Sequence, residues 1–412
     1  MLDNQDVTTF LVAAIAALPR LRQVLRCGAV KRFSSRTTIG AQKPLVTTSL
    51  SDASGLDGSI ESFILAPSPD EREFDRLARA LFAYQYANNE PYRRLCEQHG
   101  LEPADVLRWQ DIPAVSAASF ADARLACFLP ACTNISFVSS GTTRATSGRS
   151  IHELDTTKLY DASLLTHFRA CVLPDRDDIR MLMLSPPFEE ALHSSLAYML
   201  SKVFERHASG GGFFVHDDVL DYDGLAAALR AGDEPVLLFG SAFAFVHFLD
   251  ACAVRGDRFP LPSSSRIVET GGFKGKSRSV ERDELYGSLT QTFGVDSPYC
   301  IAEYGMCELG SQWYDAALAD KLAGRSPREG CKVGPHWARI LAVDPVSGEP
   351  VADGEQGLLQ VVDLSNRGSV AAVLTGDLVI VSNGGFRLLG RSPAAPPKGC
   401  SITIDAALAS RG

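Results

Sequence analysis

The feature that most constrains the fold is an alternation of strand and helix patterns through the middle of the chain. Short apolar runs, namely "RMLMLS" (180–185), "PVLLFG" (235–240), "RIVET" (266–270) and "YCIAEYG" (299–305), are typical of buried strands. Another strand is expected at "GFFVHD", and helices are expected at 192–204, 222–231, 241–253 and 279–294. Strands alternating with helices predict an α/β fold with a mostly parallel sheet that is covered on both faces.

The pattern changes along the chain, and 412 residues are enough for two or three domains. Residues 1–58 are interpreted as a poorly ordered N-terminal extension, and residues 59–331 as the α/β body, whose first clear helix begins near Glu71. Short strands and turns predict a β-rich subdomain over 332–390. Residues 391–412 are interpreted as a short tail.

Composition excludes several classes of protein. A net charge of −9 argues against a general nucleic-acid-binding or membrane-surface protein. Ten cysteines without C-x-x-C spacing indicate reduced thiols in a cytoplasmic protein. The apolar segment Phe10–Leu18 is too short to span a membrane. The basic, Ser/Thr-rich stretch that follows it has some features of a transit peptide, so that interpretation stays open beside a loose extension.

The stretch "FVSSGTTRATSGRS" (137–150) contains four Ser, three Thr and two Gly. Hydroxyl groups and backbone N–H groups in a glycine-containing turn form a concave site for an anion without fixed charge. We therefore expect this loop to bind phosphate oxygens.

A second candidate is "ETGGFKGKSR" (269–278), which follows a predicted strand. Gly275, Lys276 and Ser277 fit the end of a P-loop, but Thr270 occupies the position of its first glycine. The glycine pair that remains allows a flat ligand to approach the backbone, and the lysines could reach a phosphate. A plain strand-to-helix turn with solvated lysines is the alternative.

Three further stretches carry groups that suit a nucleotide. They are "AEYGMCELGSQWYD" (302–315), "VLTGDLV" (373–379) and "FRLLGRS" (386–392). An aromatic ring with a carboxylate at a strand end can stack a base and hold a cation, and a short carboxylate can accept hydrogen bonds from ribose hydroxyls. Each stretch could instead be an ordinary turn.

The order of these elements resembles the adenylate-forming (acyl-activating) superfamily. "SSGTTR" is similar to its Ser-Gly-Thr-Thr-Gly loop, and "YGMCE" is similar to its Tyr-Gly-x-Thr-Glu. More narrowly, the chain resembles the acyl-protein synthetases (long-chain-fatty-acid–luciferin-component ligases), which are relatives of phenylacetate–CoA ligases. The narrower resemblance extends over roughly residues 60–404 and includes "LFAYQYANNEPYRRLC", "WQDIPAV", "FGSAFAFVHFLDA", "DLSNRGSV" and "KGCSI".

The resemblance implies an adenylate-forming large domain without the usual C-terminal small domain, and ATP and Mg²⁺ as cofactors. It implies Tyr304 against the adenine, Glu308 at the Mg²⁺, and Asp377 and Arg391 near the ribose. The nucleotide-binding residues that it implies are Ser139, Ser140, Gly141, Thr142, Thr143, Gly271, Gly272, Tyr304, Gly305, Cys307, Asp377 and Arg391.

The chain departs from the superfamily pattern at three points. Arg144 replaces the glycine of the Ser/Thr loop, and Cys307 replaces a threonine whose hydroxyl is a better donor than a thiol. Third, the resemblance implies that the chain lacks the superfamily's small domain, which supplies a lysine that assists adenylation. Lys274 or Lys276 is our candidate catalytic substitute for that lysine.

The family resemblance also implies the acyl acceptor, Cys400 in "KGCSI". Nine residues of extended chain before it span at most ~30 Å. The expected reaction is activation of a fatty or other carboxylic acid as acyl-AMP, transfer to the Cys400 thiol, and delivery to a partner reductase or acyltransferase. A ligase that transfers to coenzyme A, and a nucleotide-binding module without turnover, are the alternatives.

A run of aromatic residues on one predicted helix has two interpretations. Phe243, Phe245 and Phe248 could line an acyl site, or they could be plain helix core.

Overall fold

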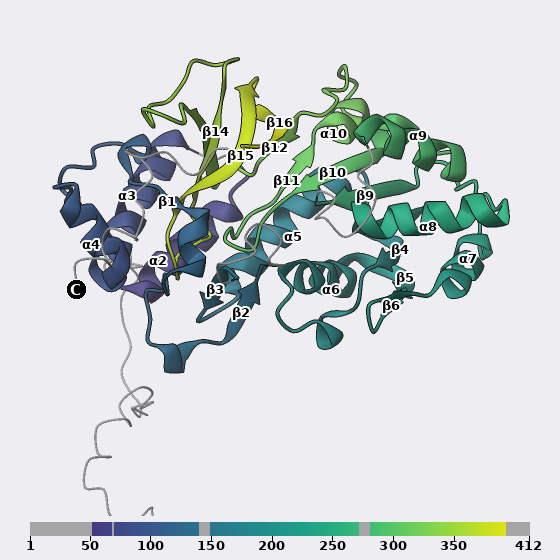
Figure 1. The fold of residues 1–412 in the computed structure, drawn as a ribbon, viewed down its shortest axis with the longest axis horizontal. Helices are drawn as coiled ribbons and strands as arrows, with labels where there is room; N and C mark the ends of the chain where they lie inside the picture. Colours follow the sequence, from purple (N-terminus) through teal and green to yellow (C-terminus); the bar gives the residue numbers. More distant parts are fainter. Residues whose placement is uncertain (1–51, 68–69, 140–148, 272–280, 393–412) are drawn as a thin grey trace, which may run out of the picture. The chain divides into compact units, whose positions relative to one another are not determined.

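A twelve-stranded mixed sheet runs through the part of the chain that this computed structural model describes (Figure 1). The described residues are 52–67, 70–139, 149–271 and 281–392, and they lie within one compact unit, Thr48–Gly412. The strand order is β13-β14-β15-β16-β12-β11-β10-β9-β8-β4-β5, and β1 (Val115–Ser116) pairs with β15 at the side of this path.

One half of the sheet is parallel, as the alternating pattern predicts. Its strands pair in the order β5-β4-β8-β9-β10, all in parallel. They are β4 (Ile179–Leu184), β5 (Ala208–Phe213), β8 (Val236–Ser241), β9 (Arg266–Thr270) and β10 (Cys300–Tyr304).

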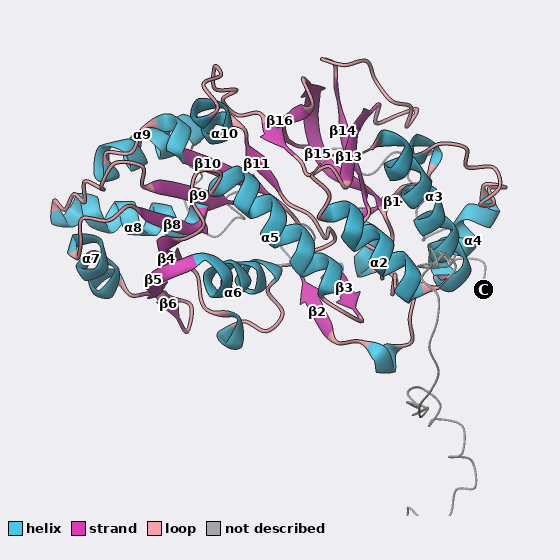
Figure 2. Cartoon of the chain, turned by 180° about the vertical axis from the view of Figure 1, so that it is seen from behind, coloured by secondary structure: helices cyan, strands magenta, loops and turns pink. Residues whose placement is uncertain are grey.

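Helices cover both faces of this half because successive strand residues point in opposite directions. On β4, Met181 and Met183 pack with one set of helices, whereas Leu182 and Leu184 pack with the other set. The first set is α5 (Lys158–Val172) and α6 (Ser195–His207). The second set is α7 (Tyr222–Arg230), α8 (Ala242–Arg255) and α9 (Arg282–Phe293). Figure 1 shows α8 and α9 over the strands, and Figure 2 shows α5 and α6 from behind.

The other half of the sheet is antiparallel, and all of its strands except β11 begin within the stretch predicted as β-rich, 332–390. It comprises β11 (Trp313–Asp315), β12 (Lys332–Val333), β13 (Ala338–Val343), β14 (Gln356–Asp363), β15 (Ala372–Ser382) and β16 (Gly385–Arg391). Antiparallel pairing of β10 with β11 and of β12 with β16 continues the parallel half without a break. The predicted α/β class is confirmed, and the β-rich strands extend the main sheet.

Among the described residues, three helices precede the sheet and pack on its antiparallel half (Figure 2). They are α2 (Ala53–Ile64), α3 (Glu71–Asn88) and α4 (Glu90–Gln98). α2 begins inside the stretch predicted as an extension, because Leu56, Ile60 and Phe63 lie on one face and are buried. The Asp52 side chain caps its first turn through the N–H of Gly55 at 2.7 Å.

A buried arginine joins α2 to the rest of the chain. Arg367 is 3% exposed, and its guanidinium donates to Asp57 of α2 at 2.7 Å and to Asp155 at 3.0 Å. Removal of one partner from such a buried pair is costly, since the other charge remains away from water.

The remaining elements are short. They are a hairpin of β2 (Ile135–Val138) and β3 (Ile151–Leu154), a hairpin of β6 (Val215–His216) and β7 (Val219–Leu220), α10 (Ala317–Leu322), and 3₁₀ turns at Trp109–Asp111, Ala117–Ala121, Pro130–Cys132, Phe188–Glu190 and Ser297–Tyr299.

The aromatic residues of α8 are mostly core. Phe245 and Phe248 have no exposed surface, and Phe248 stacks on Phe293 with ring centroids 6.1 Å apart. Phe243 is partly exposed and contacts the ring of His247. The core interpretation therefore holds for Phe245 and Phe248. Within the described ranges, no helix is both long and apolar enough to cross a membrane.

Candidate nucleotide site

Eight of the predicted site residues are described, and they come from five separate strands or strand ends. These residues are Ser139, Gly271, Tyr304, Gly305, Cys307, Glu308, Asp377 and Arg391. The others, Ser140, Gly141, Thr142, Thr143, Gly272, Lys274, Lys276 and Cys400, lie outside the described residues.

Three of the predicted residues form one hydrogen-bonded cluster. The Tyr304 hydroxyl at the end of β10 donates to Asp377 Oδ2 at 2.8 Å. Arg391 at the end of β16 donates from Nε to Asp377 Oδ1 at 3.2 Å. Asp377 is 8% exposed, whereas the Arg391 side chain is 55% exposed. The carboxylate thus has a buried neutral donor on one oxygen and an exposed cation on the other.

A bulge in β15 directs Asp377 to this position. Leu374 and Leu378 keep their β14 partners, but Thr375, Gly376 and Asp377 together lie opposite a single residue of β14. The Thr375 hydroxyl donates to the carbonyl of that residue at 2.9 Å. Extra residues on one strand bend the strand and redirect its side chains.

The Tyr304 ring is held by two other aromatic side chains. Its centroid lies 6.1 Å from that of Trp313 and 5.3 Å from that of Phe386, both in edge-on geometry. Burial, and next the negative charge of Asp377, raise the pKa of Tyr304 well above its ordinary value. The hydroxyl is therefore protonated and can donate to the carboxylate. Only 8% of Tyr304 is exposed, so a base could contact only a small part of the ring.

The loop 305–312 joins β10 to β11 and carries Glu308. His152 of β3 contacts the carbonyl of Cys307 from Nδ1 at 2.7 Å, and Asn366 Nδ2 donates to the carbonyl of Glu308 at 2.9 Å. A carbonyl can only accept, so His152 Nδ1 carries the proton. Burial lowers the pKa of His152 to about 4, which keeps the ring neutral near pH 7.

Asp363 fixes the far end of the same loop. It accepts from the N–H of Gly310 at 3.1 Å and from the hydroxyl of Ser311 at 2.8 Å. A side chain at Gly310 would come within 2.4 Å of the Ser365 hydroxyl oxygen. The close approach of the two segments therefore requires glycine at this position.

The ends of the Ser/Thr loop meet at the β2–β3 hairpin. The N–H of Ser139 donates to the carbonyl of Ser150 at 3.0 Å, and the N–H of Ser150 donates to the Ser139 hydroxyl at 3.0 Å. The same hairpin carries His152 and so contacts the Glu308 loop. The structure thereby brings the end of the predicted phosphate loop beside the predicted metal-binding turn.

The ends of β9 and β10 also contact each other. Thr270 is the register partner of Glu303, and its hydroxyl donates to the Glu303 carboxylate. A side chain at Gly305 would come within 2.6 Å of Glu303 Oε1, so a larger residue there would require the Glu303 carboxylate to shift. Gly271 is exposed and has a φ of +73°, a conformation that glycine adopts readily.

The described residues fit a metal ion that arrives with a nucleotide. They contain no group of three or more His, Cys, Asp or Glu that could hold a metal ion. Glu308 is 5% exposed, and its carboxylate forms no hydrogen bond or ion pair with another described residue. Mg²⁺ is commonly bound by one or two carboxylates together with substrate phosphates, so a single glutamate suits it.

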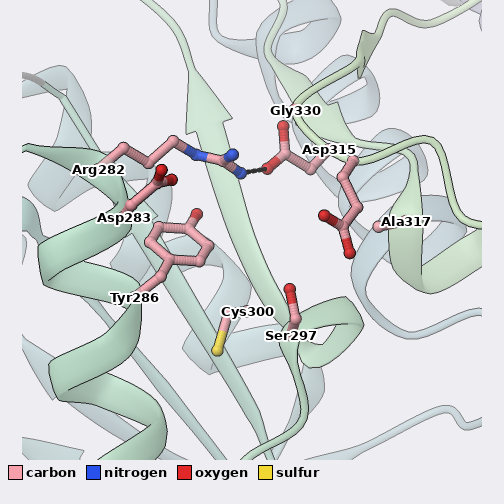
Figure 3. Close-up of a pocket in the computed structure, with 9 residues that line it drawn as sticks. Arg282, Asp283, Tyr286, Ser297, Cys300, Asp315, Ala317 and Gly330 are labelled. Atoms are coloured by element: carbon pink, nitrogen blue, oxygen red, sulfur yellow. Dashed lines mark hydrogen bonds and ion pairs between the residues drawn. The ribbon is translucent and has the colours of Figure 1, made fainter.

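A polar cavity of about 150 Å³ lies among α9, β10 and β11 (Figure 3). Arg282 reaches across it to Asp315 at 3.0 Å, and Lys332 contacts the other oxygen of Asp315 at 3.2 Å. Burial raises the pKa of the nearby Glu269 to about 7. Arg282 lies at the start of α9 and Glu269 lies in β9, so two of these charged residues belong to the elements that flank residues 272–280.

His152, Asp363 and Asn366 were not predicted as site residues. Each contacts the backbone of a loop that is distant in sequence. The polar run "DLSNRGS" (363–369) was the available signal, because its residues are mostly buried and yet are not apolar.

Comparisons with known proteins identify a matching family model and similar curated proteins. The family model described as acyl-protein synthetase, LuxE, matches residues 46–409. The long-chain-fatty-acid–luciferin-component ligase of Vibrio harveyi is 25% identical over 352 residues, which cover 82% of this chain and 88% of that protein. The ligase of the same description from Aliivibrio fischeri is 24% identical over 338 residues, which cover 78% of this chain and 84% of that protein.

Solved structures show a similar fold. 2-Hydroxyisobutyryl-CoA ligase in an open conformation, in complex with 2-HIB-AMP and CoA, has a TM-score of 0.56 at 13% identity and covers 78% of this chain and 75% of its own. The same ligase in the thioesterification state has a TM-score of 0.57 at 13% identity, and the match covers 83% of this chain and 74% of the ligase chain. At this identity the likeness concerns the fold alone.

Proposed function

Because this chain belongs to the LuxE acyl-protein synthetase family and is an ATP-dependent, acyl-adenylate-forming ligase, we propose that it activates a fatty acid and transfers the acyl group to its own Cys400. The observation that carries the proposal is the cluster of Tyr304, Asp377 and Arg391 beside the Glu308 loop. The names of the two curated relatives support a fatty acid as the substrate class.

In the first half-reaction, a carboxylate oxygen of the acid attacks the α-phosphorus of ATP. The bond from that phosphorus to the bridging oxygen breaks, and pyrophosphate leaves. Asp377 and Arg391 bind and orient the ribose, and the Ser/Thr loop from Ser139 to Thr143 binds phosphate oxygens. Glu308 holds Mg²⁺, which neutralises charge on the phosphate oxygens when bound. Lys274 or Lys276 stabilises the α-phosphate.

In the second half-reaction, the Cys400 thiolate attacks the acyl carbonyl carbon. The thiol proton passes to solvent, the bond from this carbon to the AMP oxygen breaks, and a thioester forms as AMP leaves. The thioester is then delivered to a partner reductase or acyltransferase. Such a partner would match the luciferin-component wording of the relatives' names.

Two measurements test the proposal. Acid-dependent exchange of pyrophosphate into ATP reports the first step, and Glu308→Gln should abolish it at limiting Mg²⁺. Radiolabelled fatty acid retained on the denatured protein reports the second step. Cys400→Ser should preserve exchange and eliminate the hydroxylamine-labile label, since a serine hydroxyl offers almost no anion near pH 7. Cys132→Ser, at an exposed cysteine of a 3₁₀ turn, is the matched control and should keep the label.

The other outcomes identify the alternatives. Consumption of coenzyme A without labelled protein would replace self-acylation by a CoA ligase activity. Absence of exchange with a panel of acids would indicate a nucleotide-binding module without turnover. Formation of ADP in place of AMP would support the P-loop interpretation of 270–277 and contradict the whole scheme.

A further inference from the structure

We propose that His152 and Asn366 are positioning residues that set the direction of the Glu308 side chain. This inference rests on the proposed function in taking Glu308 as the Mg²⁺ ligand. Its basis is the way in which two buried side chains hold two successive peptide groups.

The two contacts fall on either side of one Cα atom. His152 holds the carbonyl of Cys307 at 2.7 Å, and Asn366 holds the carbonyl of Glu308 at 2.9 Å. Each carbonyl belongs to a planar peptide group, one before and one after the Glu308 Cα. Because φ and ψ are the only soft backbone torsions of a residue, fixing both planes fixes both torsions. The Cα–Cβ bond of Glu308 then has one direction.

The two donors are themselves firmly held. His152 is 1% exposed, and its ring contacts Phe120 edge-on with centroids 5.8 Å apart. Asn366 has no exposed surface, and its Nδ2 also donates to the carbonyl of Val370 at 2.9 Å. The donors come from β3 and from the segment after β14, so two independent parts of the chain hold one residue.

Glu308 has no other anchor among the described residues. Its carboxylate forms no hydrogen bond or ion pair with them, although the residue is 5% exposed. Backbone orientation is therefore what aims this carboxylate. A misdirected carboxylate would weaken binding of the Mg²⁺ complex of ATP and leave binding of metal-free ATP unaffected.

The decisive experiment measures nucleotide binding by calorimetry without any carboxylic acid, once with excess Mg²⁺ and once with EDTA. His152→Leu and Asn366→Leu remove the donors. Each should weaken Mg·ATP binding by roughly five- to tenfold, the worth of one hydrogen bond, with metal-free ATP unchanged. His207→Leu is the matched control. His207 is also buried, and its Nδ1 lies 2.8 Å from the carbonyl oxygen of Asp177, but this contact is outside the candidate site.

A pair of milder variants keeps the test valid if the leucine variants do not fold. The amide nitrogen of His152→Asn can take the place of Nδ1, whereas that of His152→Gln lies one bond farther out. The variant His152→Asn should retain Mg·ATP binding, whereas His152→Gln should lose it. Equal effects of His152→Asn and His152→Gln, or equal weakening with and without Mg²⁺, would overturn the inference. A parent protein that binds neither form of ATP would instead refute the proposed function.

Discussion

The Tyr304 hydroxyl donates a 2.8 Å hydrogen bond to the Asp377 carboxylate, and so joins the end of β10 to the bulge of β15. The bond connects the parallel half of the sheet to the antiparallel half at the place where the nucleotide is expected. One oxygen of Asp377 is thereby oriented by a neutral donor, while the other contacts the exposed Arg391. Both oxygens of this carboxylate are thereby held by protein side chains.

Tyr304→Phe should therefore weaken ATP binding more than it weakens the fold. Without the hydroxyl, Asp377 loses its buried donor, and we expect a rise of about three- to tenfold in the KM for ATP, the worth of one hydrogen bond. Tyr92→Phe is the control. This buried tyrosine donates a 2.7 Å hydrogen bond to the carbonyl of Pro113, outside the candidate site. Equal KM values in the parent and in Tyr304→Phe would show that the bond has no part in binding.

Asp377→Ala should abolish discrimination between ATP and its 2′,3′-dideoxy analogue. If the carboxylate accepts from ribose hydroxyls, the parent should prefer ATP by about ten- to hundredfold in kcat/KM, as expected for hydrogen bonds to a charged group. The alanine variant should use both nucleotides equally and slowly. Retained discrimination in this variant would place the ribose elsewhere.

Lys332→Met should destabilise the protein strongly. Lys332 and Asp315 are an ion pair with side chains 8% and 2% exposed, and the lysine also donates to the carbonyl of Ala302 at 3.2 Å. Loss of the lysine should cost about 3 kcal/mol, the lower end for a broken buried pair, because Arg282 still contacts Asp315. Urea unfolding measures the change.

The control is Lys321→Met in an exposed pair of similar length. Lys321 and Asp296 are 3.2 Å apart with side chains 37% and 74% exposed. Such pairs contribute about 0–1 kcal/mol. A comparable loss in the two variants would mean that the charge on Lys332 is not what stabilises the fold.

Stability should fall as the pH falls from 6.5 towards 4, partly through two histidines. Burial lowers the pKa of both His152 and His167 to about 4, so the unfolded chain takes up their protons first. Above pH 6.5, the approximate pKa of a histidine in the unfolded chain, this effect costs the folded state no stability. As the pH falls below that value, the folded state loses stability relative to the unfolded chain. For each histidine the loss by pH 4.5 is about 2.5 kcal/mol.

His152→Asn tests this effect without removing a donor to Cys307. The difference in unfolding free energy between pH 7 and pH 4.5 should shrink by about 2.5 kcal/mol in the variant. His167→Asn should act in the same direction. Glu269 has the opposite effect on stability, because its raised pKa favours the folded state as the pH falls. This contribution is the same in parent and variant, so it cancels when their unfolding free energies are compared. Identical pH dependence in all three proteins would contradict the assignment.

The parallel half of the fold could be predicted because buried parallel strands are short apolar runs. "RIVET" gives β9 at Arg266–Thr270, and "PVLLFG" gives β8 to within one residue at each end. The prediction placed β5 too late in the sequence, since the first five residues of this strand are small, namely alanine, serine and three glycines. A side chain at Gly211 would come within 1.9 Å of the Met181 carbonyl oxygen, so close packing and not hydrophobicity decides the sequence there.

The site could be predicted only in part. Tyr304, Asp377 and Arg391 were identified from short motifs, and the structure brings them together. His152 and Asn366 were missed because a buried polar residue that holds a backbone carbonyl looks, in one sequence, like any polar residue of a loop. Its role depends on a partner more than fifty residues away along the chain.

The ion pair between Asp57 and Arg367 also constrains how the chain is made. The two residues are separated by 310 positions, so the partner of α2 is synthesised long after α2 itself. At typical rates of translation this delay is about 15 to 60 s. During that interval Asp57 lacks the buried guanidinium that binds it in the folded chain, although α3 and α5, which also pack on α2, are already present. A chain stalled before Arg367 would therefore leave Asp57 and Asp155, the two carboxylates that share this guanidinium, without the cation between them.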